Sequence, residues 1–267
     1  MKLGILSDEM SPVPALSCEM AALYGIHWLE LRMWYNYRAP VGMTDRDMQE
    51  VRSLADGWGV AYGSISPGLL KIPLESDERQ AHVTDIFDKS LDLCDALGAR
   101  VMVSFTPMVP DERRGQWDSQ LLEEFRVMGD AAQARGITIA IENEPVCVAS
   151  SAPLVARLVH EIAHPAVKMN WDPGNDASSA QCTGPEAWPV VSPVLKHIHV
   201  KDYPLGTWHV TDLGEGASDW KWILATLKEH NYPGFLIIEP HGRPQLASST
   251  RALMILRQRL AEAGVEW

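Results

Sequence analysis

The sequence lacks the features that mark several large classes of protein. The 267 residues carry a formal net charge of −12, and no basic run interrupts this acidic character, which disfavours binding to the phosphates of nucleic acid. No stretch approaches the roughly 18 apolar residues of a membrane span. The opening MKLGILSDEM turns acidic too early for a secretory signal. We therefore expect a cytoplasmic protein with neither a nucleic-acid nor a membrane partner.

Cysteine is also scarce. The four cysteines form no CxxC pair, which disfavours both a disulfide scaffold and a structural zinc cluster; they are Cys18, Cys94, Cys147 and Cys182. A hydrophobic content of 46% is sufficient for a substantial core. Because no low-complexity linker divides the chain, we expect one domain over residues 1–267.

Short apolar runs alternate with amphipathic segments along the whole chain. Eight runs predict strands, at 2–7, 27–32, 60–65, 100–105, 136–141, 167–171, 196–200 and 235–239. Helical spacing predicts helices that include 79–97, 118–135, 152–163, 220–230 and 248–263. Alternation of this kind implies parallel strands joined by right-handed crossovers, and eight units predict an α/β protein with a single (β/α)8 TIM barrel. An open doubly wound sheet is disfavoured because no Gly-rich phosphate motif follows the first strand.

Polar residues stand at or near the ends of the last four predicted strands. They are Glu142, Asp172, His199 and Glu239. Because TIM barrels place catalytic groups at the carboxyl ends of their strands, we expect these four side chains to converge. An oxygen-rich set with one nitrogen suits Mn²⁺, Co²⁺, Mg²⁺ or a catalytic Zn²⁺. Three buried carboxylates would otherwise repel one another, so the pattern favours one divalent metal ion over four unrelated caps and core residues.

Several short motifs occur in a familiar order: KLGILSDEMS, GIHWLELR, AIEN, WDPGN, HIHVKD and LGEG. In their order and spacing the chain resembles, over nearly its whole length, the sugar phosphate isomerase/epimerase group of the xylose isomerase-like TIM barrels. The resemblance implies that Glu142, Asp172, His199 and Glu239 bind one metal ion, and that Glu142 and Glu239 also act as the acid/base pair. Many relatives carry a histidine where this chain has Asn175, which can donate a hydrogen bond but cannot shuttle a proton.

These residues lead to three hypotheses for the function. The first is a metal-dependent isomerase or epimerase of a sugar, sugar phosphate or polyol, which transfers a proton through a metal-bound enediolate. The second is a dehydratase or lyase on the same scaffold, similar to the inosose and dehydroshikimate dehydratases. The third is a non-catalytic barrel that serves as a partner subunit. Barrels of this kind often pair, so a homo-oligomer is compatible with the sequence.

Two residues beyond the predicted ligands are candidates for substrate contacts. Lys201 shares a face with His199 if the strand continues, where it would bind a negative charge on the substrate or form a salt bridge with a carboxylate such as Asp202. His241 follows Glu239 by two residues and would face the same way.

Three further candidates follow the second predicted strand. Glu30 and Arg32 would reach the pocket or form an ion pair in the barrel wall, and Trp34 would offer a ring face to a sugar. Together with Asn175, Lys201 and His241 they complete the predicted substrate site for a small carbohydrate or polyol.

Overall fold

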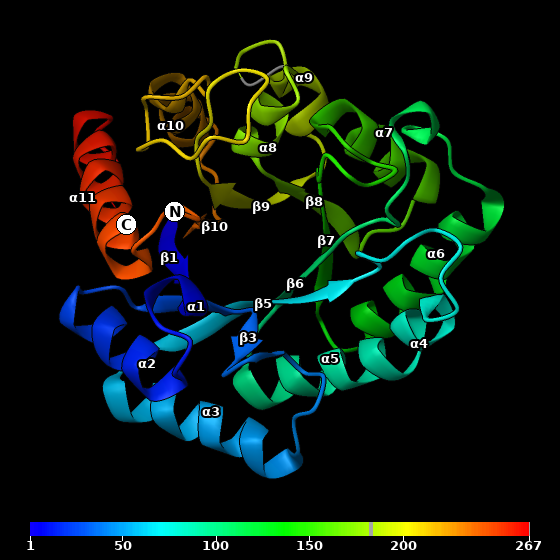
Figure 1. Ribbon diagram of the computed structural model, residues 1–267, viewed down its shortest axis with the longest axis horizontal. Helices are drawn as coiled ribbons and strands as arrows, with labels where there is room; N and C mark the ends of the chain where they lie inside the picture. Colours follow the sequence, from blue (N-terminus) through cyan, green and yellow to red (C-terminus); the bar gives the residue numbers. More distant parts are fainter. Residues whose placement is uncertain (182–183, 267) are drawn as a thin grey trace.

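Eight parallel strands close into a barrel in the computed structural model, which describes residues 1–181 and 184–266. Figure 1 shows the helices forming a ring around the strands. The predicted (β/α)8 barrel is therefore confirmed. Around the barrel the order is β1-β10-β9-β8-β7-β6-β5-β2. The strands are β1 Lys2–Leu6, β2 Trp28–Leu31, β5 Ala61–Leu69, β6 Val101–Ser104, β7 Thr138–Glu142, β8 Val167–Trp171, β9 Leu195–Val200 and β10 Phe235–Ile238.

A two-stranded antiparallel hairpin, β3 Met33–Trp34 and β4 Tyr37–Arg38, follows β2. The longer helices are α2 Pro14–Leu23, α3 Asp45–Trp58, α5 Asp85–Leu97, α6 Ser119–Ala134, α7 Ala152–Ile162, α10 Trp220–Glu229 and α11 Gln245–Glu262. The short ones are α1 Ser7–Met10, α4 Arg79–Val83, α8 Pro173–Ser178 and α9 Trp188–Val191, with a 3-10 turn at Asp111–Arg113. Within the described residues, no helix combines the length and apolar character needed to cross a membrane.

The helix predicted over 79–97 is two helices, α4 and α5, because the chain leaves helical geometry at Thr84, with φ −120° and ψ −92°. Its hydroxyl donates to the carbonyl of Gln80 at 2.9 Å, which satisfies a helix-end acceptor. On α4, His82 accepts the backbone N–H of Leu70 at 3.0 Å and so ties the helix to the end of β5. Apolar spacing continues across the break, so the sequence pattern did not reveal it.

The barrel interior is apolar at one end and polar at the other. Phe235 and Trp28, at the amino ends of β10 and β2, pack with Leu6 and Ile237. A Cβ on Gly63 would lie 2.3 Å from the ring of Phe235, so glycine is required where this ring fills the barrel. The described cysteines, Cys18, Cys94 and Cys147, are buried free thiols, and Cys182 lies outside the described residues. Because apolar side chains fill this part of the barrel, polar chemistry is expected at the carboxyl ends of the strands.

Candidate metal centre

The four residues predicted as metal ligands come together at the carboxyl ends of four neighbouring strands. Each offers a ligand atom within 4.8 Å of the others, and all four are buried. Glu142 ends β7, Asp172 follows β8, His199 lies in β9 and Glu239 follows β10. The barrel order β7-β8-β9-β10 therefore turns four positions that are distant in sequence into one cluster.

Asp172 is fixed by the turn from β8 into α8. Its Oδ1 atom accepts the backbone N–H of Asn175 at 2.9 Å and caps the helix. Asn143, at the end of β7, donates to the carbonyl of Asp172 and accepts its N–H, both at 2.8 Å. One carboxylate oxygen is thus used for folding, and the other, Oδ2, is left to the cluster.

Glu142 is held by two side-chain amides. Asn170 donates to Oε2 and Asn175 donates to Oε1, each at 3.0 Å. Asn175 was expected to contact the substrate; the structure places its amide nitrogen on the carboxylate of Glu142. Among the described residues, no lysine or arginine forms an ion pair with Glu142.

His199 is oriented from behind by a second buried carboxylate. Its Nε2 atom lies 2.9 Å from Oε1 of Glu30, and Nε2 of His197 lies 2.8 Å from Oε2 of the same residue. Ser64 also donates to Oε2 at 2.6 Å. Because Glu30 is an acceptor, Nε2 of His199 carries hydrogen and Nδ1 faces the cluster. Glu30 therefore lies behind the histidine, away from the barrel mouth, and its predicted contact with substrate has no support in this geometry.

Basic residues surround Glu239. Lys201 shares the face of His199, as its position in the sequence suggested, and its Nζ lies 2.7 Å from Oδ2 of Asp172 and 3.2 Å from Oε2 of Glu239. It does not pair with Asp202, whose carboxylate instead accepts backbone N–H groups from the loop after β9, at Gly214, Gly216 and Ser218.

Arg32 and His241 contact Glu239 from the other side. Arg32 bridges Glu239, Asp8 and Glu9, with Nη2 2.7 Å from Oδ2 of Asp8. His241 lies between two carboxylates, with Nδ1 2.8 Å from Glu9 and Nε2 3.3 Å from Glu239. Both predicted residues thus reach the cluster.

Trp34 does not present a free ring face to the barrel mouth. It lies in β3 with 5% of its surface exposed and packs into the main core. Its neighbour Tyr35 packs edge-on against it, with the ring centroids 4.9 Å apart. The sequence places Trp34 close to a strand end, but it does not show that the β3-β4 hairpin turns the indole inward.

Burial and the neighbouring charges shift the pKa values of the cluster in opposite directions. Burial raises the pKa of Asp172 to about 6, although Lys201 opposes the shift. Burial also disfavours ionisation of Glu239, but the charges of Lys201, His241 and His199 outweigh it and hold the pKa well below its ordinary value. Burial would likewise keep His199 neutral, yet Glu30, Glu142 and Glu239 raise its pKa far above the usual range. The charges of the buried carboxylates thus dominate the electrostatics of the site.

Two buried atoms show that the cluster fits a cation. Among the described residues, neither Oδ2 of Asp172 nor Nδ1 of His199 makes an aligned hydrogen bond. Nδ1 lies 3.1 Å from an oxygen of Glu142 and 3.1 Å from one of Glu239, so either a proton on Nδ1 or a cation in its place would balance the two carboxylates. Buried polar atoms rarely remain unsatisfied. Three carboxylate ligands and one imidazole suit a hard or borderline divalent ion.

Some residues of the site had no place in the sequence prediction. Asp8 and Glu9 lie in α1, the short helix after β1, and form ion pairs with Arg32. Asn170 stands two residues before Asp172 and donates to Glu142. His197 was detectable, because residues two apart in a strand share a face and His199 was already a candidate. Asn170 carried no such signal, since an amide inside a strand is an ordinary feature.

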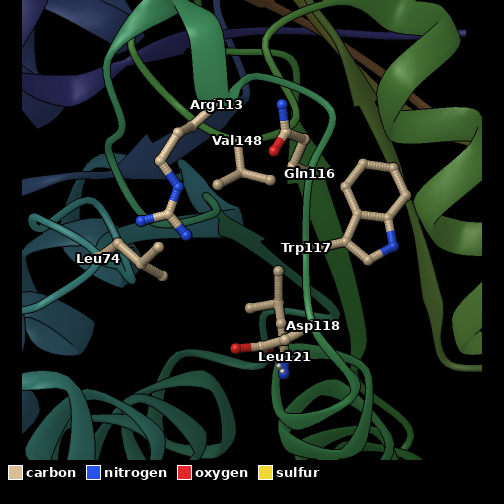
Figure 2. Close-up of a pocket in the computed structure, with 7 residues that line it drawn as sticks. All are labelled: Leu74, Arg113, Gln116, Trp117, Asp118, Leu121 and Val148. Carbon is tan, nitrogen blue, oxygen red and sulfur yellow. Dashed lines mark hydrogen bonds between the residues drawn. The ribbon is translucent and has the colours of Figure 1, made fainter.

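A separate hollow of about 170 Å³ lies beside the 3-10 turn that precedes α6 (Figure 2). Its one carboxylate, Asp118, caps α6 by accepting the N–H of Leu121 at 2.9 Å. The indole N–H of Trp117, which also lines the hollow, donates to Glu161 at 2.7 Å. These polar groups already have partners, so the hollow lacks the ligand set found at the strand ends.

Comparison with known proteins agrees with the fold. Residues 18–267 match the family model described as xylose isomerase-like TIM barrel. A search of curated protein sequences found no match.

Three similar solved structures illustrate the range of the fold. D-allulose 3-epimerase from Methylomonas sp., solved with D-allulose, is 15% identical, with a TM-score of 0.77 and 97% of each chain covered. The probable 3-DHS dehydratase AsbF from Bacillus anthracis is also 15% identical, with a TM-score of 0.77 and coverage of 96% of this chain and 99% of that chain. A xylose isomerase-like TIM barrel protein from Mycobacterium smegmatis, in complex with magnesium, is 19% identical, with a TM-score of 0.75 and coverage of 93% and 88%.

Proposed function

The chain belongs to the xylose isomerase-like TIM barrel family, and from this premise we propose that it is a divalent-metal-dependent isomerase or epimerase of a sugar or polyol. One observation carries the proposal. The carboxylates of Glu142 and Glu239 approach Nδ1 of His199 from β7 and from the end of β10, each at 3.1 Å. Two carboxylates that enter one pocket from different strands can serve the two faces of a substrate carbon.

Glu142, Asp172, His199 and Glu239 would hold the metal ion. When bound, a divalent cation polarises a carbonyl oxygen and thereby acidifies the hydrogens on the adjacent carbon. The protein fixes the positions of the ligands. Asn143 forms hydrogen bonds with the backbone of Asp172, and Glu30 contacts His199.

The surroundings of the two glutamates give them different basicities. Glu239 contacts Arg32, Lys201 and His241, so it stays ionised and is the weaker base. Glu142 is held by neutral amides, and its only ion-pair partner among the described residues is His199, so it takes up a proton more readily. We propose that the two act as an acid/base pair, in which one carboxylate removes the proton next to the carbonyl and the other, in its protonated form, returns a proton from the other side. Asn175 holds Glu142 in place by a hydrogen bond. Its amide cannot take part in proton transfer.

The probable 3-DHS dehydratase is as similar in fold as the epimerase, so loss of water is the second candidate. Removal of the same proton starts both reactions, and a leaving group on the next carbon decides between them. Ultraviolet absorbance of a new conjugated double bond separates dehydration from isomerisation.

Exchange of substrate hydrogen tests the proposal. The Mn²⁺-loaded protein is incubated in D₂O with a panel of ketoses and polyol ketones, and deuterium uptake next to the carbonyl is followed by NMR. Glu142→Gln and Glu239→Gln should each slow uptake by about 10²-fold or more. Glu215→Gln, an exposed carboxylate in the loop after β9, is the matched control.

Circular dichroism and bound Mn²⁺ are measured on every variant, because Glu142 and Glu239 are also proposed ligands. Uptake at the wild-type rate in both glutamine variants would refute the assigned roles. Absence of uptake and of a new double bond across the panel, with Mn²⁺ bound, would refute both candidate reactions.

A further inference from the structure

A cavity of about 510 Å³ is lined by residues outside the set of proposed metal ligands. It lies where the β3-β4 hairpin meets the end of β5. Its lining includes Tyr37, Arg38, Pro67, Lys71, His82 and Ile86. In the closed barrel, β5 stands across from β9, so this cavity and the metal ligands occupy facing sides of the mouth.

Arg38 is the unusual residue of this cavity. It is half-buried, and within the described residues its side chain forms neither a hydrogen bond nor an ion pair. Its guanidinium rests against Gly68, where an added Cβ would come within 2.6 Å of Nε. Burial lowers the pKa of Arg38, the charge of Arg32 adds to this shift, and Glu239 and Glu142 partly offset it through space. A desolvated cation without a partner costs free energy unless a ligand supplies the opposite charge.

The other polar groups of the cavity are already engaged. Nζ of Lys71 lies 2.6 Å from Oε2 of Glu144 and 4.6 Å from the ring of Phe105. His82 accepts a backbone N–H through Nδ1, so its hydrogen is on Nε2. One carboxylate, Glu78, also lines the cavity. The cavity thus offers one unneutralised cation, additional N–H donors and several apolar walls.

These observations describe a site for one negative charge at one end of an organic molecule. A planar guanidinium binds a carboxylate through two parallel hydrogen bonds. A phosphate dianion would leave one charge unbalanced near Glu78. We propose that the cavity binds a carboxylate on the substrate, at the end remote from its reacting carbonyl, so that the substrate is a sugar acid or another hydroxy-keto acid. This inference rests on the proposed function for the position of the carbonyl.

Three probes that share one ring separate the alternatives. D-Glucose, D-glucuronate and D-glucose 6-phosphate are titrated into the Mn²⁺-loaded protein by calorimetry. Glucuronate should bind about tenfold more tightly than glucose, the gain from one charge-assisted pair. Arg38→Gln should abolish this preference, and Arg38→Lys should keep part of it, because lysine retains the charge and loses the paired geometry. Arg46→Gln, an exposed arginine on α3, removes the same charge and should leave the preference intact.

Equal binding of glucose and glucuronate, or an unchanged preference in Arg38→Gln, would overturn the proposal. Tighter binding of glucose 6-phosphate than of glucuronate would assign the cavity to phosphate and also overturn it. Bound Mn²⁺ and deuterium uptake by neutral ketoses are recorded on the same samples. Bound Mn²⁺ and deuterium uptake at the expected levels, without a preference for glucuronate, would overturn this inference and leave the proposed function intact. A preference that depends on Arg38, in a protein without metal or uptake, would sink the proposed function alone.

Discussion

Two buried carboxylate groups share His199, and they differ in how well their oxygens are satisfied. Glu30 is completely buried and accepts hydrogen bonds from Ser64, His197 and His199 at 2.6 to 2.9 Å. Across the same imidazole, Oδ2 of Asp172 makes no aligned hydrogen bond and is paired with Nζ of Lys201, 2.7 Å away. Both sets have the residue types and spacing of a metal site. Burial of acid is therefore a weak indicator of function, and the charges that surround each carboxylate distinguish the two.

The difference has a physical basis in the charges that each group faces. Burial would raise the pKa of Glu30, but the two imidazoles more than offset it, and the pKa falls far below its ordinary range. Asp172, which faces Glu142 and Glu239, retains a raised pKa. The network around Glu30 balances its own charge. The cluster around Asp172 would gain stability on binding a cation.

The largest effect is expected from Asp172→Asn, which removes one negative charge from the proposed metal ligands. Asparagine can still cap α8 through its side-chain oxygen, so the barrel should fold. Mn²⁺ affinity should fall by more than about 100-fold, beyond the range for residues behind a ligand. The cation-free variant should be less stable than the wild type but still folded, because the buried Lys201 loses one of its two carboxylate partners and keeps Glu239. Calorimetric Mn²⁺ titration and thermal melts check both statements; loss of folding would contradict the contrast with Glu30.

Glu30→Gln should show the opposite balance. The glutamine amide would place N–H groups against the N–H of His197 or His199, so the buried network breaks at a cost of about 3 kcal/mol of unfolding free energy. Mn²⁺ affinity should fall about 10- to 100-fold, because the orientation of His199 is lost while the ligand remains. Urea unfolding and Mn²⁺ titration give the two numbers. Glu50→Gln, an exposed carboxylate on α3, is the control. Wild-type stability in Glu30→Gln would show that the network is unimportant.

The sequence predicted the cluster around Asp172 better than the hydrogen-bond network around Glu30. Glu142, Asp172 and Glu239 end or directly follow apolar runs, so their place in the barrel was visible from the alternation of strands and helices. Glu30 has partners 34 and 167 residues away, at Ser64 and His197. A hydrogen-bond network between distant strands leaves no local period.

The same limit applies outside the cluster. Arg38 lies on a hairpin of two-residue strands, and nothing near it in the sequence shows that its partners are absent. The break at Thr84 was hidden because apolar spacing runs through it. Patterns of period two or 3.6 thus predict which elements form, whereas side-chain partners depend on how those elements pack.

The smallest effect is expected from Ser64→Ala, which removes one hydrogen-bond donor from the carboxylate of Glu30. Glu30 would keep both imidazoles, which fix the carboxylate and hence His199. Unfolding free energy should fall by about 1 to 2 kcal/mol, the usual loss for a hydrogen bond to a charged acceptor. Mn²⁺ affinity should change by less than about threefold, because Nδ1 of His199 still faces the cluster. A loss of affinity as large as that of Glu30→Gln would mean that the serine, and not the pair of imidazoles, sets the position of Glu30.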